Sequence, residues 1–397
     1  MDLQSLSALD AADPLRRFRD EFLLPEGVIY LAGNSLGPLS KPAAARVEAL
    51  VREEWGRSLV AGWTDHDWLG APGRVGDGIG RLVGAAPGEV IVADSTSVDL
   101  FKLAAAALQA APDERPVLLM AEDDFPTDAY VAEAAARLCG RRLRRVPRAA
   151  LLEALDADTA LVMLTHVDYR SGEVWDLAAT TAAARAAGAT ALWDLSHTAG
   201  VLQVDLNGAG AELAVGCGYK YLNGGPGAPA WLYVARRLQA RLASPLSGWM
   251  GHAAPFDFAP GYRPAEGIGR FLAGTPPMLG LAALEGAVEL LAQADPAALQ
   301  AKARRLGDML LQRLAETCPE LEPACPGPGQ IRGGHVAFRH PQARALTAAL
   351  ARAGVVGDLR PPNLLRFGLS PLYLGYQDVG RAAALIREVL DGAAVRA

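Results

Sequence analysis

Short apolar runs alternate with alanine-rich stretches of helical periodicity between about residues 85 and 235. Strands that alternate with helices predict an α/β fold, in which helices flank both faces of a mainly parallel sheet. The expected strands are 89–93, 116–121, 160–165, 190–195, 211–216 and 229–234, and the expected helices include 98–110, 129–139 and 178–187. Ligands of such sheets bind beyond the carboxyl ends of the strands.

The pattern changes after this region. Residues 240–280 are rich in glycine, proline and aromatic side chains and lack periodicity, which predicts loops. The elements expected beyond them are helices 279–293, 297–318 and 377–390 and strands 334–338 and 364–369. We therefore predict a large domain, 46–276, and a smaller α+β domain formed by 277–397. Residues 1–45 are assigned to the small domain, although the pattern alone leaves their place open.

Composition excludes several classes of protein. No apolar run approaches the roughly 20 residues that a membrane span needs, and residues 1–24 lack a signal-peptide core. The net charge of −6 with scattered arginines argues against a nucleic-acid partner, and the arginine cluster 141–145 is interpreted as a solvated surface. The four cysteines have no disulfide or metal-ligand spacing, so we expect a soluble, cytoplasmic protein without a metal site.

Lysine is rare in this chain, with four residues against 34 arginines. Lys220 lies in a glycine-rich run, directly after an expected strand. Arginine cannot act as an amine nucleophile, so a lysine in this place is a candidate for Schiff-base formation. The other three lysines, Lys41, Lys102 and Lys302, lie in ordinary helical patterns.

Other candidate residues follow the expected strands. Asp194 could hold the proton of a pyridinium ring, as pyridoxal phosphate requires, with His197 beside it. The alternative is a helix cap and a core histidine. Thr96 and Ser97 open a helix and could bind a phosphate, or could be part of a plain cap. Phe125 could stack on a ring with Asp128 nearby, or both could belong to a turn.

Two residues of the C-terminal half are also candidates. Arg366 is a charge inside an apolar strand and needs a partner. A substrate carboxylate would bind it in a bidentate manner, and a structural salt bridge is the alternative. Trp249 lies in the loop-rich segment, where a core position competes with a contact to a ligand.

Several runs together resemble kynureninases, a family of fold type I (aspartate-aminotransferase-like) pyridoxal-phosphate enzymes. Asp194, His197 and Lys220 mark the fold group only. Gly-Asn-Ser-Leu-Gly at 33–37 and Gly-Trp-Met-Gly-His at 248–252 narrow the resemblance to the family. The remaining matching runs, which follow the family order over nearly the whole chain, are 30–32, 95–102, 125–128, 193–197, 218–223 and 366–368.

The resemblance implies a seven-stranded type of sheet, a homodimer and hydrolysis of L-kynurenine to anthranilate and L-alanine in tryptophan degradation. It makes Lys220 the Schiff-base lysine, Asp194 the partner of the pyridine nitrogen, and Tyr219 a phosphate contact or a proton donor. The implied cofactor contacts are Thr96, Ser97, Phe125, Asp128, Thr165, Asp194, His197, Tyr219 and Lys220, with Trp249 and Thr275 reaching in from the partner subunit. The implied substrate contacts are Arg366, Ser35, Trp63 and Thr275.

Some members of the family have asparagine where Thr275 stands and histidine near Trp63, so we expect kynurenine to be preferred over 3-hydroxykynurenine. Other enzymes of the fold group, class V aminotransferases and cysteine desulfurases, are the nearest alternatives, and Cys325 is the thiol that a desulfurase could use. A nicotinamide-dependent dehydrogenase is disfavoured, because the glycines at 76–80 lack the required spacing. A catalytically silent binding protein is a third alternative.

Overall fold

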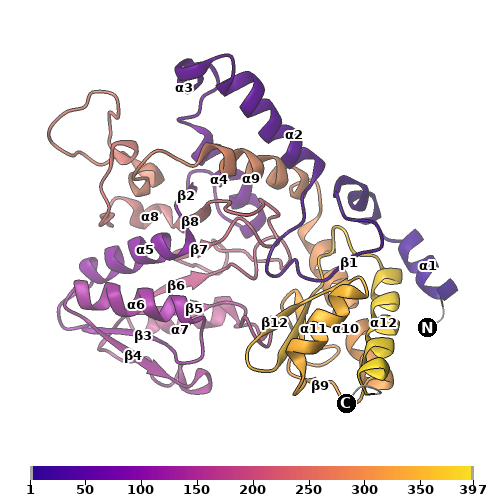
Figure 1. Cartoon of the computed structure of the whole chain (residues 1–397). Coiled ribbons are helices and arrows are strands. Elements are labelled where there is room, and N and C mark those ends of the chain that lie inside the picture. Colours follow the sequence, from indigo (N-terminus) through magenta and orange to yellow (C-terminus); the bar gives the residue numbers. More distant parts are fainter. Residues whose placement is uncertain (1–2, 395–397) are drawn as a thin grey trace.

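The computed structural model describes residues 3–394, which form a seven-stranded sheet, a four-stranded sheet and the helices around them (Figure 1). The large sheet has the order β2-β8-β7-β6-β5-β3-β4, and only β8 runs antiparallel to its neighbours. Its strands are β2 Val90–Ala93, β3 Val117–Ala121, β4 Arg142–Val146, β5 Thr159–Thr165, β6 Thr190–Asp194, β7 Leu213–Gly216 and β8 Ala230–Val234. The predicted α/β fold with a mainly parallel sheet is confirmed.

The sheet is apolar on both faces because helices cover both. Leu118 and Met120 of β3 join one core cluster with α5 (Thr96–Ala110) and α6 (Pro126–Leu138). The alternate residue Leu119 joins the other cluster, on the opposite face. That face is covered by α4 Ala71–Val83, α7 Leu177–Ala186 and α9 Met278–Leu291.

The C-terminal part forms an antiparallel sheet of order β12-β13-β10-β9 with helices packed around it. Its elements are α10 Pro296–Thr317, β9 Glu322–Pro323, β10 His335–Arg339, α11 Ala343–Arg352, β11 Val355–Val356, β12 Asp358–Arg360, β13 Leu364–Gly368 and α12 Tyr376–Ala394. In Figure 1 these elements, orange to yellow, gather on one side of the molecule.

The N-terminal segment lies against this C-terminal part. β1 (Ile29–Tyr30) pairs in parallel with β11, and α1 (Leu3–Ala11) packs on α12. These contacts support the division that we propose, a small domain of 1–45 and 277–397 beside a large domain of 46–276. The other N-terminal elements are η1 Arg16–Glu21, α2 Lys41–Ala49, η2 Leu50–Trp55, η3 Leu59–Ala61 and α3 Gly62–Asp65.

One feature differs from the sequence expectations. The arginine cluster at 141–145 forms most of the edge strand β4, where Arg142 and Arg144 form ion pairs with Asp158 and Asp156 at 3.2 and 2.8 Å. Its surface position was expected, but its strand was not, because arginine stems replace the usual apolar alternation. The segment 240–280 is mostly loop, as predicted; it contains the short helices η5 Trp249–Gly251 and η6 Gly267–Phe271, and α9 begins near its end, at Met278. Within residues 3–394, no helix is long and apolar enough to span a membrane.

Lys102 and Lys302, which looked ordinary in the sequence, are buried ion-pair partners. Lys302 Nζ lies 2.6 Å from Asp13 Oδ2. Lys102 is fully buried in α5, pairs with Asp94, lies 3.7 Å from Asp99, and donates a 2.7 Å hydrogen bond to the Phe271 carbonyl. It therefore ties the start of α5 to the end of η6.

We predict that Lys102→Met lowers the apparent thermal midpoint, because Asp99 then remains buried without a cation. Removing one partner of a buried pair destabilises by about 3–5 kcal/mol. Differential scanning fluorimetry checks this, with Lys41→Met at an exposed position as the matched control. Equal midpoints for the two variants would contradict a stabilising role for Lys102.

Candidate active site

Lys220 lies on the loop that follows β7, and glycines make that loop possible. A Cβ on Gly218 would collide with the Pro229 carbonyl, and one on Gly37 would lie 2.5 Å from the Lys220 carbonyl oxygen. The Gly37 N–H donates to the Tyr219 carbonyl at 2.8 Å. The run 33–37 thus holds the lysine loop by direct backbone contact. Lys220 Nζ donates no hydrogen bond to any described residue and lies 5.8 Å from the centre of the Tyr219 ring.

Two buried carboxylates lie near this amine at the carboxyl ends of the strands. The sheet register places Thr165 opposite Asp194, and Asp194 opposite Val215. Asp194 accepts the Ser196 N–H at 2.7 Å, while Asp128, from the first turn of α6, interacts with Asp194. Burial, and then the charge of Asp194, raise the pKa of Asp128 well above its usual value. The pair therefore favours sharing a proton, or a cation placed between them.

A neutral imidazole completes this side of the site. His197 is buried, and its Nδ1 has no hydrogen-bond partner among the described residues. Burial, and then the charge of Lys220, lower the pKa of His197 well below its usual value. His335 of β10 lies behind it, with ring centres 5.6 Å apart. Phe125, partly exposed before α6, packs edge-on against Tyr169 at 5.2 Å.

The N-terminus of α5 is available to a phosphate. Its N-cap Ser95 has extended backbone and makes no side-chain cap, while Thr96 and Ser97 are half-buried. The first N–H groups of a helix lack intrahelical partners and favour an anion. The predicted phosphate site and the predicted ring site thus lie on the ends of the same sheet. These residues fit pyridoxal phosphate, since an amine, two acids, a flat imidazole and an anion-binding helix end are all present.

Arg366 is wholly buried in β13 and bound to protein groups. Its Nε donates to Asp358 Oδ1 at 2.7 Å, and its Nη2 donates to Ser35 Oγ at 3.1 Å. Its Nη1 donates to the Tyr169 carbonyl. The structural salt bridge is therefore present, and binding of a substrate carboxylate by Arg366 stays a prediction. Ser35, predicted as a substrate contact, lies at this arginine.

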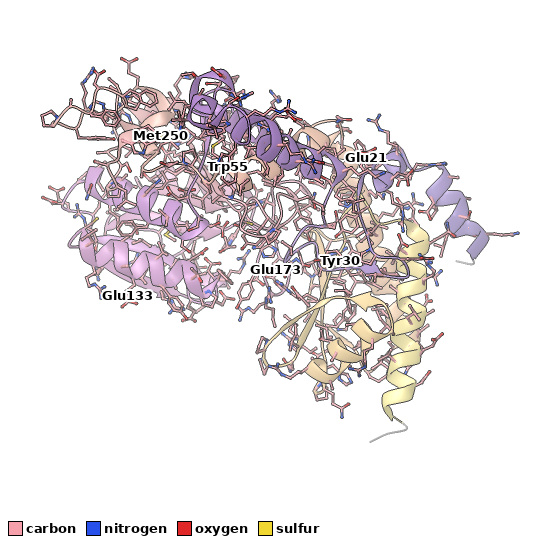
Figure 2. The ribbon with its side chains drawn as sticks, turned by 45° about the horizontal axis from the view of Figure 1, so that its top comes forward. Glu21, Tyr30, Trp55, Glu133, Glu173 and Met250 are labelled. Atoms are coloured by element: carbon pink, nitrogen blue, oxygen red, sulfur yellow. The ribbon has the colours of Figure 1, made fainter. Side chains whose placement is uncertain are left out.

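Three predicted residues, Trp63, Trp249 and Thr275, make no direct contact with Lys220 among the described residues. Trp249 packs edge-on against Trp63 with ring centres 5.6 Å apart, and Thr275 is exposed in the loop before α9. No hydrogen bond or ring contact joins them to Lys220 or Thr96 among the described residues. In Figure 2, Met250, which follows Trp249 in the chain, lies in the upper left of the molecule, and Trp55 lies to its right.

The structure adds residues that the sequence patterns did not single out, namely Tyr169, His335, Asp358 and Arg360. Asp358 and Arg360 form a three-residue strand before two prolines, too short to give a periodic signal. His335 follows Gly334, whose carbonyl accepts the Tyr221 hydroxyl at 2.7 Å. A Cβ on Gly334 would lie 2.7 Å from that same hydroxyl oxygen, so only glycine fits here. The pair Gly333-Gly334 is therefore the sequence feature that could have indicated a close contact next to His335.

Relatives of known name share this chain over almost its full length. The kynureninase of Deinococcus radiodurans is 49% identical over 400 residues, covering 98% of this chain and 97% of that protein. The kynureninase of Pseudomonas fluorescens is 44% identical over 392 residues, covering 97% and 94%. The chain belongs to the kynureninase family. A family model described as the kynureninase C-terminal domain matches residues 299–386, which include Arg366 and His335.

Solved structures of low identity share the fold. A cysteine desulfurase from Thermococcus onnurineus NA1 has a TM-score of 0.80 at 18% identity, covering 95% of this chain and 98% of that chain. The cystine C-S lyase C-DES has a TM-score of 0.79 at 18% identity, covering 91% and 98%. A kynureninase-family chain therefore shares its architecture with enzymes of other named activities, and the fold alone does not separate them.

We predict that Gly37→Ala displaces the lysine loop and weakens cofactor binding. The added methyl group meets backbone at Lys220, which cannot yield as a flexible side chain can. Absorbance of the bound cofactor after dialysis measures its retention. The control is Gly73→Ala in α4, where a Cβ meets nothing within 4 Å. Equal retention by the two variants would show that the tight contact at Gly37 does not position Lys220.

Proposed function

We propose that this chain is a kynureninase, a hydrolase that cleaves the Cβ–Cγ bond of L-kynurenine with pyridoxal phosphate as cofactor. The products are anthranilate and L-alanine, and the reaction belongs to tryptophan degradation. Full-length relatives with this name support the activity. The observation that carries the assignment of residues is the unpaired Lys220 amine beside the buried pair Asp128 and Asp194.

Each residue has a role that its surroundings support. Pyridoxal phosphate, when bound, supplies an electron sink for negative charge at the substrate's α- and β-carbons. Lys220 would hold the cofactor's aldehyde and, when free, its amine could take up the substrate's α-proton. Asp194 would keep the ring nitrogen protonated, with Asp128 beside it. His197 would lie against the ring, and Thr96 and Ser97 would bind the phosphate. Thr165 fixes Asp128 through a weak hydrogen bond at 3.5 Å.

Tyr219 suits proton donation. Burial, the neighbouring Cys217 thiol and the Asp194 carboxylate raise the pKa of Tyr219 above its usual value. Its hydroxyl therefore stays protonated at neutral pH and can give a proton to carbon or oxygen of the substrate.

We predict that Tyr219→Phe lowers kcat by about 100-fold while cofactor retention is unchanged. Loss of cofactor with little change in kcat of the loaded enzyme would instead make Tyr219 a phosphate contact only.

We predict that Lys220→Ala abolishes turnover of L-kynurenine, because the other three lysines cannot replace it: Lys41 is exposed on α2, and Lys102 and Lys302 are held in buried ion pairs. The measurement is anthranilate fluorescence, with Lys41→Ala as the control. Multiple turnovers by Lys220→Ala would overturn the assignment.

The same assay with 3-hydroxykynurenine tests the expected preference for kynurenine, which rests on Thr275 and Trp63.

A cysteine desulfurase activity is less well supported. Cys325, the thiol that could serve it, is half-buried, and burial raises its pKa. A thiol held in its protonated form is a weak nucleophile.

All four cysteines are free thiols, which fits the cytoplasmic location that we also propose.

We propose a homodimer in which Trp249 and Thr275 reach the partner's site. Several large apolar side chains close in sequence to Trp63 or Trp249 are exposed, which supports an interface in this part of the surface. They are Trp55, Leu59, Val60, Phe256 and Phe258. Among the described residues, no hydrogen bond or ring contact joins Trp249 to Lys220 of the same chain, which is compatible with this arrangement. The partner copy is then needed to complete each site.

Subunit mixing tests this arrangement. We predict that Trp249→Ala and Lys220→Ala are each inactive alone but regain activity when dissociated and reassembled together. Each mixed dimer holds one site with both residues intact, so random mixing returns about a quarter of the wild-type activity. No recovery, or an active Trp249→Ala enzyme, would contradict a shared site.

A further inference from the structure

Asp94 forms a strained turn between β2 and the helix end that is proposed to bind the phosphate. Its backbone φ of 38° lies in the left-handed region, which residues other than glycine rarely adopt and which aspartate and asparagine tolerate best. The turn leads from Ala93, the last residue of β2, to Ser95, the N-cap of α5. The Asp94 carbonyl accepts the Ala230 N–H at 3.1 Å. Backbone strain persists only where the surroundings hold it, and it is common at binding sites.

Lys102 holds this turn from inside the protein. It lies about two helical turns further along α5, and side chains on a helix point back toward its N-terminus. The Lys102 side chain is fully buried, and its Nζ pairs with Asp94 and donates to the Phe271 carbonyl at 2.7 Å. An ammonium group has three N–H donors, so it can serve both acceptors at once. The carboxylate of Asp94, 33% exposed, is thus fixed to an enclosed cation that is itself tied to η6.

The charge of Asp94 matters because of the residues that follow it. Thr96 and Ser97 come two and three residues later, and no side chain caps the helix there. The free N–H groups of a helix start attract a phosphate dianion, whereas a carboxylate beside them repels it. Asp99, the second acid near Lys102, is fully buried and lies 3.7 Å from Nζ. Asp94 is therefore the acid that a ligand at this helix end would meet, and Lys102 offsets its charge.

We propose that Lys102 is a positioning residue for the phosphate end of the cofactor site, where it fixes the turn at Asp94 and offsets the negative charge of that residue. This inference rests on the proposed binding of the phosphate by Thr96 and Ser97. The enclosed amine of Lys102 has no surface of its own for a ligand, so it acts through Asp94. The two members of the ion pair then have opposite effects, because Lys102 favours the phosphate and the charge of Asp94 opposes it. A purely structural ion pair would need both members alike.

The test measures the dissociation constants of pyridoxal phosphate and of pyridoxal for the full-length protein freed of cofactor, from the absorbance of the bound aldehyde. Pyridoxal lacks the phosphate, so the ratio of the two constants reports on the phosphate end alone. In Lys102→Met, the dissociation constant of pyridoxal phosphate rises about 30-fold, while that of pyridoxal changes little. Asp94→Asn keeps a residue that tolerates the turn and removes the charge, so it binds pyridoxal phosphate at least as well as wild type.

The double variant Asp94→Asn/Lys102→Met provides a second measurement if Lys102→Met is too unstable to assay. It has lost the repelling charge but also the group that holds the turn, so its affinity for pyridoxal phosphate falls only about fivefold below that of Asp94→Asn. Equal affinities of the double variant and Asp94→Asn would show that Lys102 does not hold the turn, and would overturn the proposal.

Lys302→Met is the matched control, because Lys302 is also a buried lysine in an ion pair but belongs to α10, away from α5. It should lower the thermal midpoint and leave the ratio of the two dissociation constants unchanged. The proposal is wrong if Lys102→Met weakens pyridoxal as much as pyridoxal phosphate, if Lys302→Met changes the ratio equally, or if Asp94→Asn loses as much affinity as Lys102→Met. Thr96→Val without a selective loss of pyridoxal phosphate would instead overturn the phosphate site on which the proposal rests.

Discussion

The buried guanidinium of Arg366 connects three segments that are far apart in the sequence. It binds Ser35 from the N-terminal loop, the Tyr169 carbonyl from the large domain that we propose, and Asp358 from the C-terminal sheet. A charge with no contact to water must find partners in protein, so these three segments cannot separate without exposing or stranding it. These contacts of Arg366 therefore help to hold the C-terminal sheet against the segments that contain Ser35 and Tyr169.

The second constraint is the parallel arrangement of β5, β6 and β7. Parallel neighbours end at the same edge, so Thr165 and Asp194 lie side by side next to the lysine loop. Burial, and then the negative charge of Asp194, raise the pKa of Asp128 well above its usual value. The large sheet supplies the acids and the amine, while the C-terminal sheet supplies the arginines. The candidate site exists only where the two meet.

Much of this could be predicted from the chain, because the central strands are apolar on both faces and stand out from their helices. Lys220, Asp194 and Thr96 could be predicted as candidate site residues because ligands of such folds bind beyond the ends of the strands. Edge strand β4 was missed because its side chains are arginines. The pairing of Arg360 with Ser35 could not be inferred either. It joins residues 325 apart in sequence, and no local pattern encodes such a contact.

The burial of two lysines has a consequence for the chemistry of the whole surface. Lys102 and Lys302 are enclosed in ion pairs, so only Lys41 and Lys220 present side-chain amines to solvent among the four. An aldehyde reacts reversibly with any accessible primary amine. Because arginine replaces lysine on most of the surface, few side-chain amines compete with Lys220 for an aldehyde cofactor. The scarcity of lysine therefore limits imine formation at other positions.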